Sequence, residues 1–142
     1  MSTEADIVIV YTASEAGYAY PLVQALWEDR GIPPPDYVFT RDSCYYTATE
    51  MVKPLVGILE SEPSLKARTS LDRIIMLDDR ESNFALNKSN GLVIPAYEPE
   101  PTVEGIKRED RMLLVALEEI RSRIRQIRHA DALERTAPTQ SA

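Results

Sequence analysis

The sequence predicts an α/β domain built on a parallel β-sheet and followed by a long C-terminal helix. Short β-prone runs alternate with helical segments over residues 7–97, and this alternation is typical of parallel sheets with crossover helices. The run "IIML" at 74–77 is continuously apolar, as expected of a strand that is buried on both faces. A chain of 142 residues with 44% apolar content is long enough for one domain with a hydrophobic core.

The first strand and helix are predicted near the N-terminus. "DIVIVYTA" contains a run of β-prone residues from Ile7, which predicts a strand. Ser14 is predicted to cap the next helix, which runs through "YAYPLVQALWEDR" and is closed by Gly31. Pro21 disturbs this helix without abolishing it. After the rigid loop "GIPPPD", the run "YVFTR" predicts a second short strand.

The middle of the chain repeats the order of helix and strand. "MVKPLVGILE" predicts an apolar helix with Pro54 in its first turn, and "SEPSLKARTS" predicts a polar connector. The next strand ends in Asp78 and Asp79, and a short helical turn and the strand "GLVIPAY" follow it. These elements complete the α/β pattern.

The segment "EPEPTVEG" interrupts the pattern before a long C-terminal helix. Its apolar residues alternate in steps of four and three and form one stripe: Leu113, Leu117, Ile120, Ile124 and Ile127. This stripe either docks on the domain or belongs to a solvated amphipathic helix. Four arginines, at 121, 123, 125 and 128, offer a contact for an acidic partner or nucleic acid, although their spacing scatters them around the helix. Residues 133–142 are predicted to be disordered.

Composition and charge exclude several classes of protein. Residues 1–104 carry 8 basic and 17 acidic groups, and such an acidic body argues against a broad nucleic-acid footprint. Cys44 is the single cysteine, so a reducing compartment is favoured over a disulfide-bonded protein. Neither a membrane span nor a signal peptide is evident. We therefore expect a soluble intracellular protein, nuclear or cytoplasmic.

Three features are candidates for a functional site. Thr12 follows the first strand, Lys53 lies in the apolar run "MVKPL", and Asp78 and Asp79 follow the strand "RIIML". If the sheet is parallel, the carboxyl ends of its strands bring these side chains to one rim, where ligands of open α/β sheets bind. A hydroxyl, an ammonium group and carboxylates together suit a phosphate and Mg²⁺.

Each candidate also has a purely structural interpretation. Thr12 can serve as a helix cap, since Thr and Ser in strand-to-helix turns are mostly caps. Lys53 can extend its ammonium group to solvent while its stem is buried. Asp78 and Asp79 can form a surface turn or a cap. Because neighbouring residues of a strand face opposite ways, one aspartate can ligate Mg²⁺ while the other pairs with Lys53. We favour Asp79 for the metal and Asp78 for Lys53.

Four separated motifs, in order, resemble a known family. They are "IVIVYTASEAGYAYPLVQAL", "YVFTRDSCYY", "MVKPL" and "RIIMLDDRESNFALNKSNGLVIPAY". Together they look like the phosphatase domain of the NLI-interacting-factor-like family, which contains the CTD phosphatases and small CTD phosphatases of the haloacid dehalogenase superfamily. The resemblance covers roughly residues 6–118. It implies a domain over residues 1–120, followed by a helical extension and tail over 121–142.

The resemblance also implies a chemistry. It implies a Rossmann-like parallel sheet, Mg²⁺ dependence and hydrolysis of phosphoserine or phosphothreonine in proteins. The phosphate-binding threonine and lysine of the family correspond to Thr12 and Lys53, and its acidic motif near the metal corresponds to Asp78 and Asp79. The stretch 41–44 matches a family segment that is expected to be structural.

One family motif is missing from the 142 residues. Family members begin with a strand that ends in an Asp-x-Asp motif, whose first aspartate attacks phosphorus and whose second serves as acid and base. No Asp-x-Asp occurs in this sequence, and "DIVIVYTAS" matches the strand that follows the nucleophile. The fold is therefore expected to be incomplete on its N-terminal side, and the catalytic nucleophile is absent from this chain.

Three interpretations stay open at this point. The chain is either the C-terminal portion of a protein phosphatase, a phosphate-binding pseudophosphatase or scaffold module, or one half of a split enzyme. In the last case a partner chain completes the sheet. In the second interpretation the rim holds a phosphopeptide or no ligand, and none of the three predicts activity of this chain alone.

Overall fold

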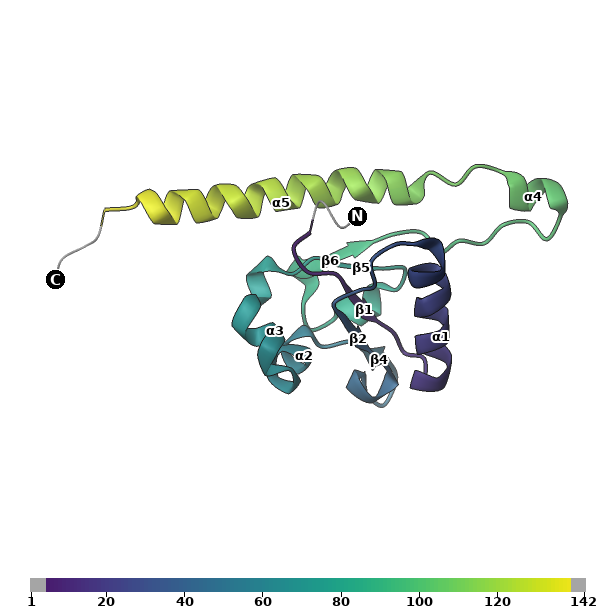
Figure 1. Ribbon diagram of the computed structural model, residues 1–142, viewed down its shortest axis with the longest axis horizontal. Helices are drawn as coiled ribbons and strands as arrows, with labels where there is room; N and C mark the ends of the chain where they lie inside the picture. The colour runs from purple at the N-terminus through teal and green to yellow at the C-terminus, as the bar shows by residue number, and fades with distance from the viewer. Residues whose placement is uncertain (1–4, 139–142) are drawn as a thin grey trace. The chain divides into compact units, whose positions relative to one another are not determined.

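The protein is described by a computed structural model over residues 5–138 (Figure 1). The chain divides into two compact units, residues 1–93 and 94–142. The strands of the described part lie in the first unit, and the second is helical. In the described residues no helix combines the length and the hydropathy that crossing a membrane would need.

The N-terminal part forms a parallel strand–helix–strand arrangement. Strands β1 (Ile9–Tyr11) and β2 (Tyr37–Phe39) pair in parallel, as the sequence predicts. Helix α1 (Ala16–Leu26) and a 3-10 turn (Glu28–Arg30) connect them. Gly31 ends this turn with a φ of 69°, a left-handed conformation that glycine adopts without steric cost.

The next segment differs from the prediction in two places. The β3 strand (Tyr45–Tyr46) and β4 (Met51–Val52) form a small antiparallel hairpin, so the first residues of "MVKPLVGILE" are a strand and not a helix. Helix α2 (Leu55–Ser61) begins only after Pro54, because a residue that precedes proline is disfavoured in the helical conformation. The predicted connector contains a further helix, α3 (Pro63–Arg68), with proline in its first turn.

The third pair of strands carries the adjacent aspartates. Strand β5 (Met76–Asp78) pairs in parallel with β6 (Gly91–Val93), and Asp78 lies at the carboxyl end of β5. Two 3-10 turns connect them, Glu81–Phe84 and Lys88–Asn90, which confirms the predicted helical turn.

The core of the first unit lies under both parallel ladders. Its most buried apolar residues come from α2, α3, β5 and the turn after β5: Leu55, Ile58, Leu59, Leu65, Met76 and Phe84. Ile9, Tyr11 and Phe39 of the β1–β2 ladder pack against this cluster. Full burial of such side chains stabilises the fold by about 1.5–3 kcal/mol each. The α2–α3 segment is therefore what holds the two ladders together.

The predicted fold class is confirmed in its coarse form. The protein is α/β with small parallel sheets and a long C-terminal helix. The strands do not form one continuous sheet, because β1–β2, β3–β4 and β5–β6 are separate two-stranded ladders.

Residues 94–138, the described part of the second unit, contain two helices. In α4 (Val103–Lys107) the Thr102 hydroxyl caps the first turn by accepting a hydrogen bond from the Gly105 amide at 2.9 Å. Helix α5 (Met112–Thr136) is the predicted long helix. The prediction of disorder from residue 133 is wrong as far as Thr136, which is still helical, and residues 139–142 of that prediction lie outside the described part.

Gly91 provides a test of the packing between β6 and the core. A Cβ atom added at Gly91 would lie 2.4 Å from Cδ2 of Phe84, a buried ring that has no room to move. We expect Gly91→Ala to lower the free energy of unfolding by about 1–3 kcal/mol, because overpacking forces neighbouring atoms to shift. Urea unfolding followed by circular dichroism measures this. Gly17→Ala is the matched control, since nothing lies within 4 Å of its added Cβ, and an equal loss in both variants would contradict the packing argument.

Candidate functional site

The turn between β1 and α1 is built around Thr12. Its amide donates to the Phe39 carbonyl at 2.9 Å, and its hydroxyl oxygen accepts from the Ser14 amide at 3.1 Å. The predicted N-cap role of Ser14 is therefore wrong. The cap residue of α1 is Glu15, which makes no capping hydrogen bond with its side chain. The Thr12 hydroxyl keeps its own proton available for donation to an anion.

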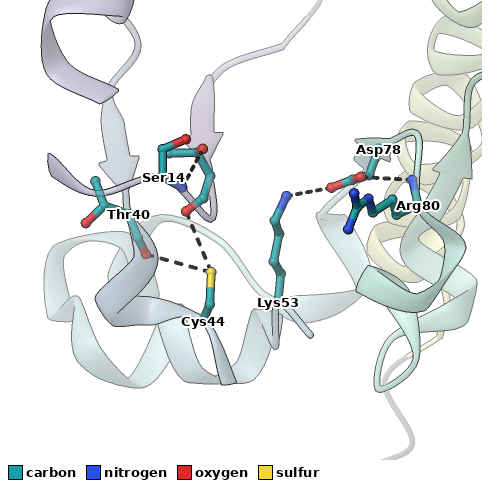
Figure 2. Close-up of polar contacts among 7 residues, drawn as sticks. Ser14, Thr40, Cys44, Lys53, Asp78 and Arg80 are labelled. Carbon is teal, nitrogen blue, oxygen red and sulfur yellow. Dashed lines mark hydrogen bonds and ion pairs between the residues drawn. The ribbon is translucent and has the colours of Figure 1, made fainter. Parts of the chain in front are cut away.

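Cys44 lies directly against this turn, which sequence reasoning did not predict. Its thiol is within weak hydrogen-bonding distance of two backbone carbonyls, Thr12 at 3.6 Å and Thr40 at 3.9 Å (Figure 2). Burial raises the pKa of the Cys44 thiol, and the nearby charges of Lys53 and Arg41 lower it by less. The thiol is therefore a protonated structural contact and not a nucleophile, because only the thiolate attacks.

Lys53 and Asp78 form a buried ion pair. Lys53 Nζ lies 2.7 Å from Asp78 Oδ2, and their side chains are 10% and 9% exposed. The pair joins the segment between β4 and α2 to the carboxyl end of β5. In Figure 2 the Lys53 side chain stands between Cys44 and Asp78. This is the predicted pairing, and the structure rejects the alternative in which Lys53 extends to solvent.

The ionised form of Asp78 is stabilised despite its burial. Burial alone raises the pKa of the Asp78 carboxyl, but hydrogen bonding from Lys53, the Arg80 amide and the Asn83 side chain outweighs that effect. The pKa therefore lies below its ordinary value. The Arg80 amide donates to Asp78 Oδ1 at 3.0 Å, so both carboxylate oxygens have protein partners.

Asn83 contacts both members of the pair and was missed by sequence reasoning. Its backbone carbonyl accepts from the Lys53 amide at 3.3 Å, and its side chain helps to lower the pKa of Asp78. Asn83 is only 3% exposed, and its Oδ1 has no hydrogen-bond partner among the described residues. An asparagine in a polar turn gives no signal in the sequence that would separate it from a surface residue.

Asp79 is the more exposed of the two adjacent aspartates. It is exposed, whereas Asp78 is occupied by Lys53 and the Arg80 amide. In residues 5–138 no three His, Cys, Asp or Glu side chains gather as a complete metal site would require. Mg²⁺ commonly binds through one or two carboxylates and takes its remaining ligands from water and phosphate oxygens. Asp79 therefore has the donor chemistry of one Mg²⁺ ligand, and its assignment as the metal ligand stays a prediction.

The structure brings three of the four candidates, Thr12, Lys53 and Asp78, to one rim around Cys44. Thr12 contacts Cys44, and the charges of Lys53 and Asp78 act on the Cys44 thiol. The carboxyl ends of β1 and β5 therefore lie on the same side of the core. The predicted roles of Thr12 and Lys53 in binding phosphate, and of the aspartates in binding metal, stay predictions.

Separating the buried ion pair is expected to be costly. Lys53→Met leaves the Asp78 carboxylate buried without its cation, and loss of one partner of a buried pair typically costs about 3–5 kcal/mol. The double variant Lys53→Met with Asp78→Asn removes both charges, so its loss of unfolding free energy should be clearly smaller than the sum of the two single losses. Urea unfolding measures all three variants. Additive losses would show that the two charges do not interact.

An exposed pair serves as the control for that experiment. Arg111 and Glu109 lie 3.1 Å apart with side chains 65% and 71% exposed. Glu109→Gln should change stability by less than about 1 kcal/mol, since exposed ion pairs contribute little.

Asp78 should also make stability depend on pH. Its folded-state pKa is lower than its unfolded value, so the ionised carboxyl stabilises the protein above the ordinary carboxyl pKa. This contribution is lost as the pH falls through the folded-state pKa. Unfolding free energies measured from pH 7 to about pH 3 should therefore fall, and fall less steeply in Asp78→Asn. Asp29→Asn removes an exposed carboxyl instead. If the unfolding free energy falls less steeply with pH in this variant too, the effect comes from net charge and not from Asp78.

The sequence of this chain matches a known protein family. A sequence model of the family described as NLI interacting factor-like phosphatase matches residues 1–131. A search of curated proteins found no sequence that matches the chain. The family match contains Thr12, Lys53 and both aspartates of the rim, and it supports a phosphatase-type function that acts on phosphorylated substrates. This chain belongs to the NLI interacting factor-like phosphatase family.

Proposed function

We propose that this chain is the C-terminal portion of a Mg²⁺-dependent protein serine/threonine phosphatase domain and is inactive without a further segment. The observation that carries the proposal is the buried Lys53–Asp78 pair beside the Thr12 turn, in a chain of a phosphatase family. Phosphorylated proteins or peptides are the proposed ligands. The two parallel ladders are proposed to be parts of one Rossmann-like sheet of the haloacid dehalogenase type.

Each residue of the rim has a defined task in this proposal. Thr12 donates its hydroxyl proton to a phosphate oxygen, and Lys53 supplies positive charge as a compact ammonium group. Asp78 orients Lys53 through their ion pair. Asp79 would hold Mg²⁺, which when bound neutralises phosphate charge.

The same geometry explains why we expect no turnover. Hydrolysis through a covalent intermediate requires an activated nucleophile close to phosphorus. Asp78 is held by Lys53 and the Arg80 amide, and the raised pKa of the half-buried Cys44 thiol disfavours the thiolate that would attack. The 142 residues contain no Asp-x-Asp motif. A hydroxyl and an ammonium group at the rim can hold a phosphate ester, but they cannot replace the missing attacking group.

A phosphate-binding pseudophosphatase or scaffold is the second candidate. One observation favours it. The rim keeps a hydroxyl and an ammonium group that suit an anion, whereas the 142 residues contain no Asp-x-Asp motif to supply the attacking carboxylate. In that case binding of a phosphopeptide is the whole function of this site.

Hydrolysis and binding assays test these proposals together. Release of p-nitrophenol from p-nitrophenyl phosphate by the chain should equal the buffer blank with and without Mg²⁺. Clear metal-dependent turnover would refute the inactivity and require another nucleophile. Titration of a phosphoserine peptide, followed by calorimetry, should show binding that Thr12→Val weakens by roughly tenfold, through loss of a hydrogen bond to a charged group.

The matched control for the binding assay is Ser14→Ala. Ser14 contributes its amide, and not its side chain, to the Thr12 turn. It should bind the phosphoserine peptide like the unchanged chain. Equal affinity of Thr12→Val and the unchanged chain would remove Thr12 from the phosphate site.

A further inference from the structure

Two cations near the rim already have partners within the protein. Lys53 Nζ lies 2.7 Å from Asp78 Oδ2, so this pair carries no net charge. Arg41 donates from Nε to the Ala13 carbonyl at 2.9 Å and from Nη1 to Glu15 at 3.0 Å. A phosphate monoester carries close to two negative charges at neutral pH. A phosphate at this rim therefore gains most from a cation that is not yet paired.

Arg80 carries such a cation. Its backbone is fixed at the site, because its amide donates to Asp78 Oδ1 at 3.0 Å. The residue is exposed, and within residues 5–138 its guanidinium makes no hydrogen bond or ion pair. Figure 2 shows the Arg80 side chain turned toward Lys53. The backbone thus holds Arg80 beside the buried ion pair while the N–H donors of its guanidinium stay available to a ligand.

The charges around Arg80 make this cation important for an anion. Three carboxylates lie beside it in the sequence, those of Asp78, Asp79 and Glu81. Together with Lys53 and Arg80, these residues carry three negative and two positive charges. Without Arg80, one ammonium group would stand against three carboxylates, and like charges repel an incoming phosphate. Binding of phosphate to the protein residues of this rim should therefore depend on Arg80.

We propose that Arg80 is a phosphate-binding residue, whose guanidinium donates two parallel hydrogen bonds to the phosphate of a phosphorylated serine or threonine. The inference rests on the proposed function, because it adds a third residue to the site of Thr12 and Lys53. A planar guanidinium matches two oxygens of one phosphate group, whereas an ammonium group acts as a point charge. Arg80 then leaves the third terminal oxygen to Thr12 and Lys53. A monoester has three such oxygens and a diester has two, so the ligand is a phosphate monoester.

The phosphate itself suits Arg80 better than a carboxylate elsewhere in the ligand. The Arg80 side chain turns toward Lys53, the other cation of the proposed site. Residues 1–104 carry 8 basic and 17 acidic groups, so an acidic segment of a ligand would be repelled over much of the surface. A peptide whose only charge is its phosphate is therefore the appropriate probe.

Calorimetric titration with such a peptide tests the proposal. The probe has blocked ends and one phosphoserine among glycine and alanine residues. Arg80→Gln should bind it about tenfold more weakly than the unchanged chain, because hydrogen bonds to a charged group are lost. Arg80→Lys keeps the charge but not the two parallel donors, and its affinity should lie between the two.

Two controls show that the effect belongs to the Arg80 side chain. Arg30→Gln also removes one exposed arginine, from the turn that follows α1, and should bind the peptide like the unchanged chain. Arg80→Gln keeps the backbone amide that bonds to Asp78. Its unfolding midpoint in urea should therefore equal that of the unchanged chain, which reports that the buried ion pair is intact.

A second peptide identifies the group that Arg80 binds. It has aspartate on both sides of the phosphoserine and is otherwise identical. The fold-loss of affinity in Arg80→Gln should be the same for both peptides. A loss that occurs only with the aspartate peptide would assign Arg80 to a neighbouring carboxylate and overturn the inference.

The same titrations separate this inference from the proposed function. Equal affinity of Arg80→Gln and the unchanged chain, with weaker binding by Thr12→Val, would overturn the inference alone. Weaker binding by Arg80→Gln, with no change in Thr12→Val, would support the role of Arg80 and remove Thr12 from the site. No binding of either peptide to the unchanged chain would overturn both proposals.

Discussion

The buried ion pair between Lys53 and Asp78 is the constraint on which the rim depends. An ammonium group or a carboxylate alone at about one-tenth exposure would be costly, so each holds the other in place. The pair connects segments that are distant in sequence, the end of the β3–β4 hairpin and the end of β5. Asn83 and the Arg80 amide add hydrogen bonds that favour the charged carboxylate. Charge, and not apolar packing alone, therefore fixes where the ends of β4 and β5 meet.

This constraint matters because the strands themselves are short. The β1, β2, β5 and β6 strands each contain three residues, and no ladder joins the two parallel pairs. The shared core of α2 and α3 holds the ladders from one side, and the contacts of Cys44 and Lys53 hold their carboxyl ends. A rim of this kind is positioned by side chains more than by a continuous sheet. Its geometry should therefore be sensitive to single polar substitutions.

Much of the fold could be predicted from the periodicity of apolar residues and from the residues that end helices and strands. The parallel strands around residues 9, 37, 76 and 91 and the long C-terminal helix follow from β-prone runs and from the apolar stripe. The start of α2 was predicted too early in the chain. Proline is common both in the first helical turn and just before it, so the sequence does not show whether Pro54 belongs to the helix. The hairpin of β3 and β4 was missed, since two-residue strands leave almost no pattern. The continuity of the sheet could not be predicted, because strand order depends on contacts that are distant in sequence.

The part of the candidate site that could be predicted consists of charged residues flanked by apolar residues in the sequence. Lys53 inside "MVKPL" and Asp78 after "IIML" both signal a buried charge that needs a partner, and the structure pairs them. Asn83 and Cys44 are ordinary in their local sequence, and only tertiary packing brings them to the rim. The capping role predicted for Ser14 is wrong, because the cap residue of α1 is Glu15, whose side chain makes no capping hydrogen bond.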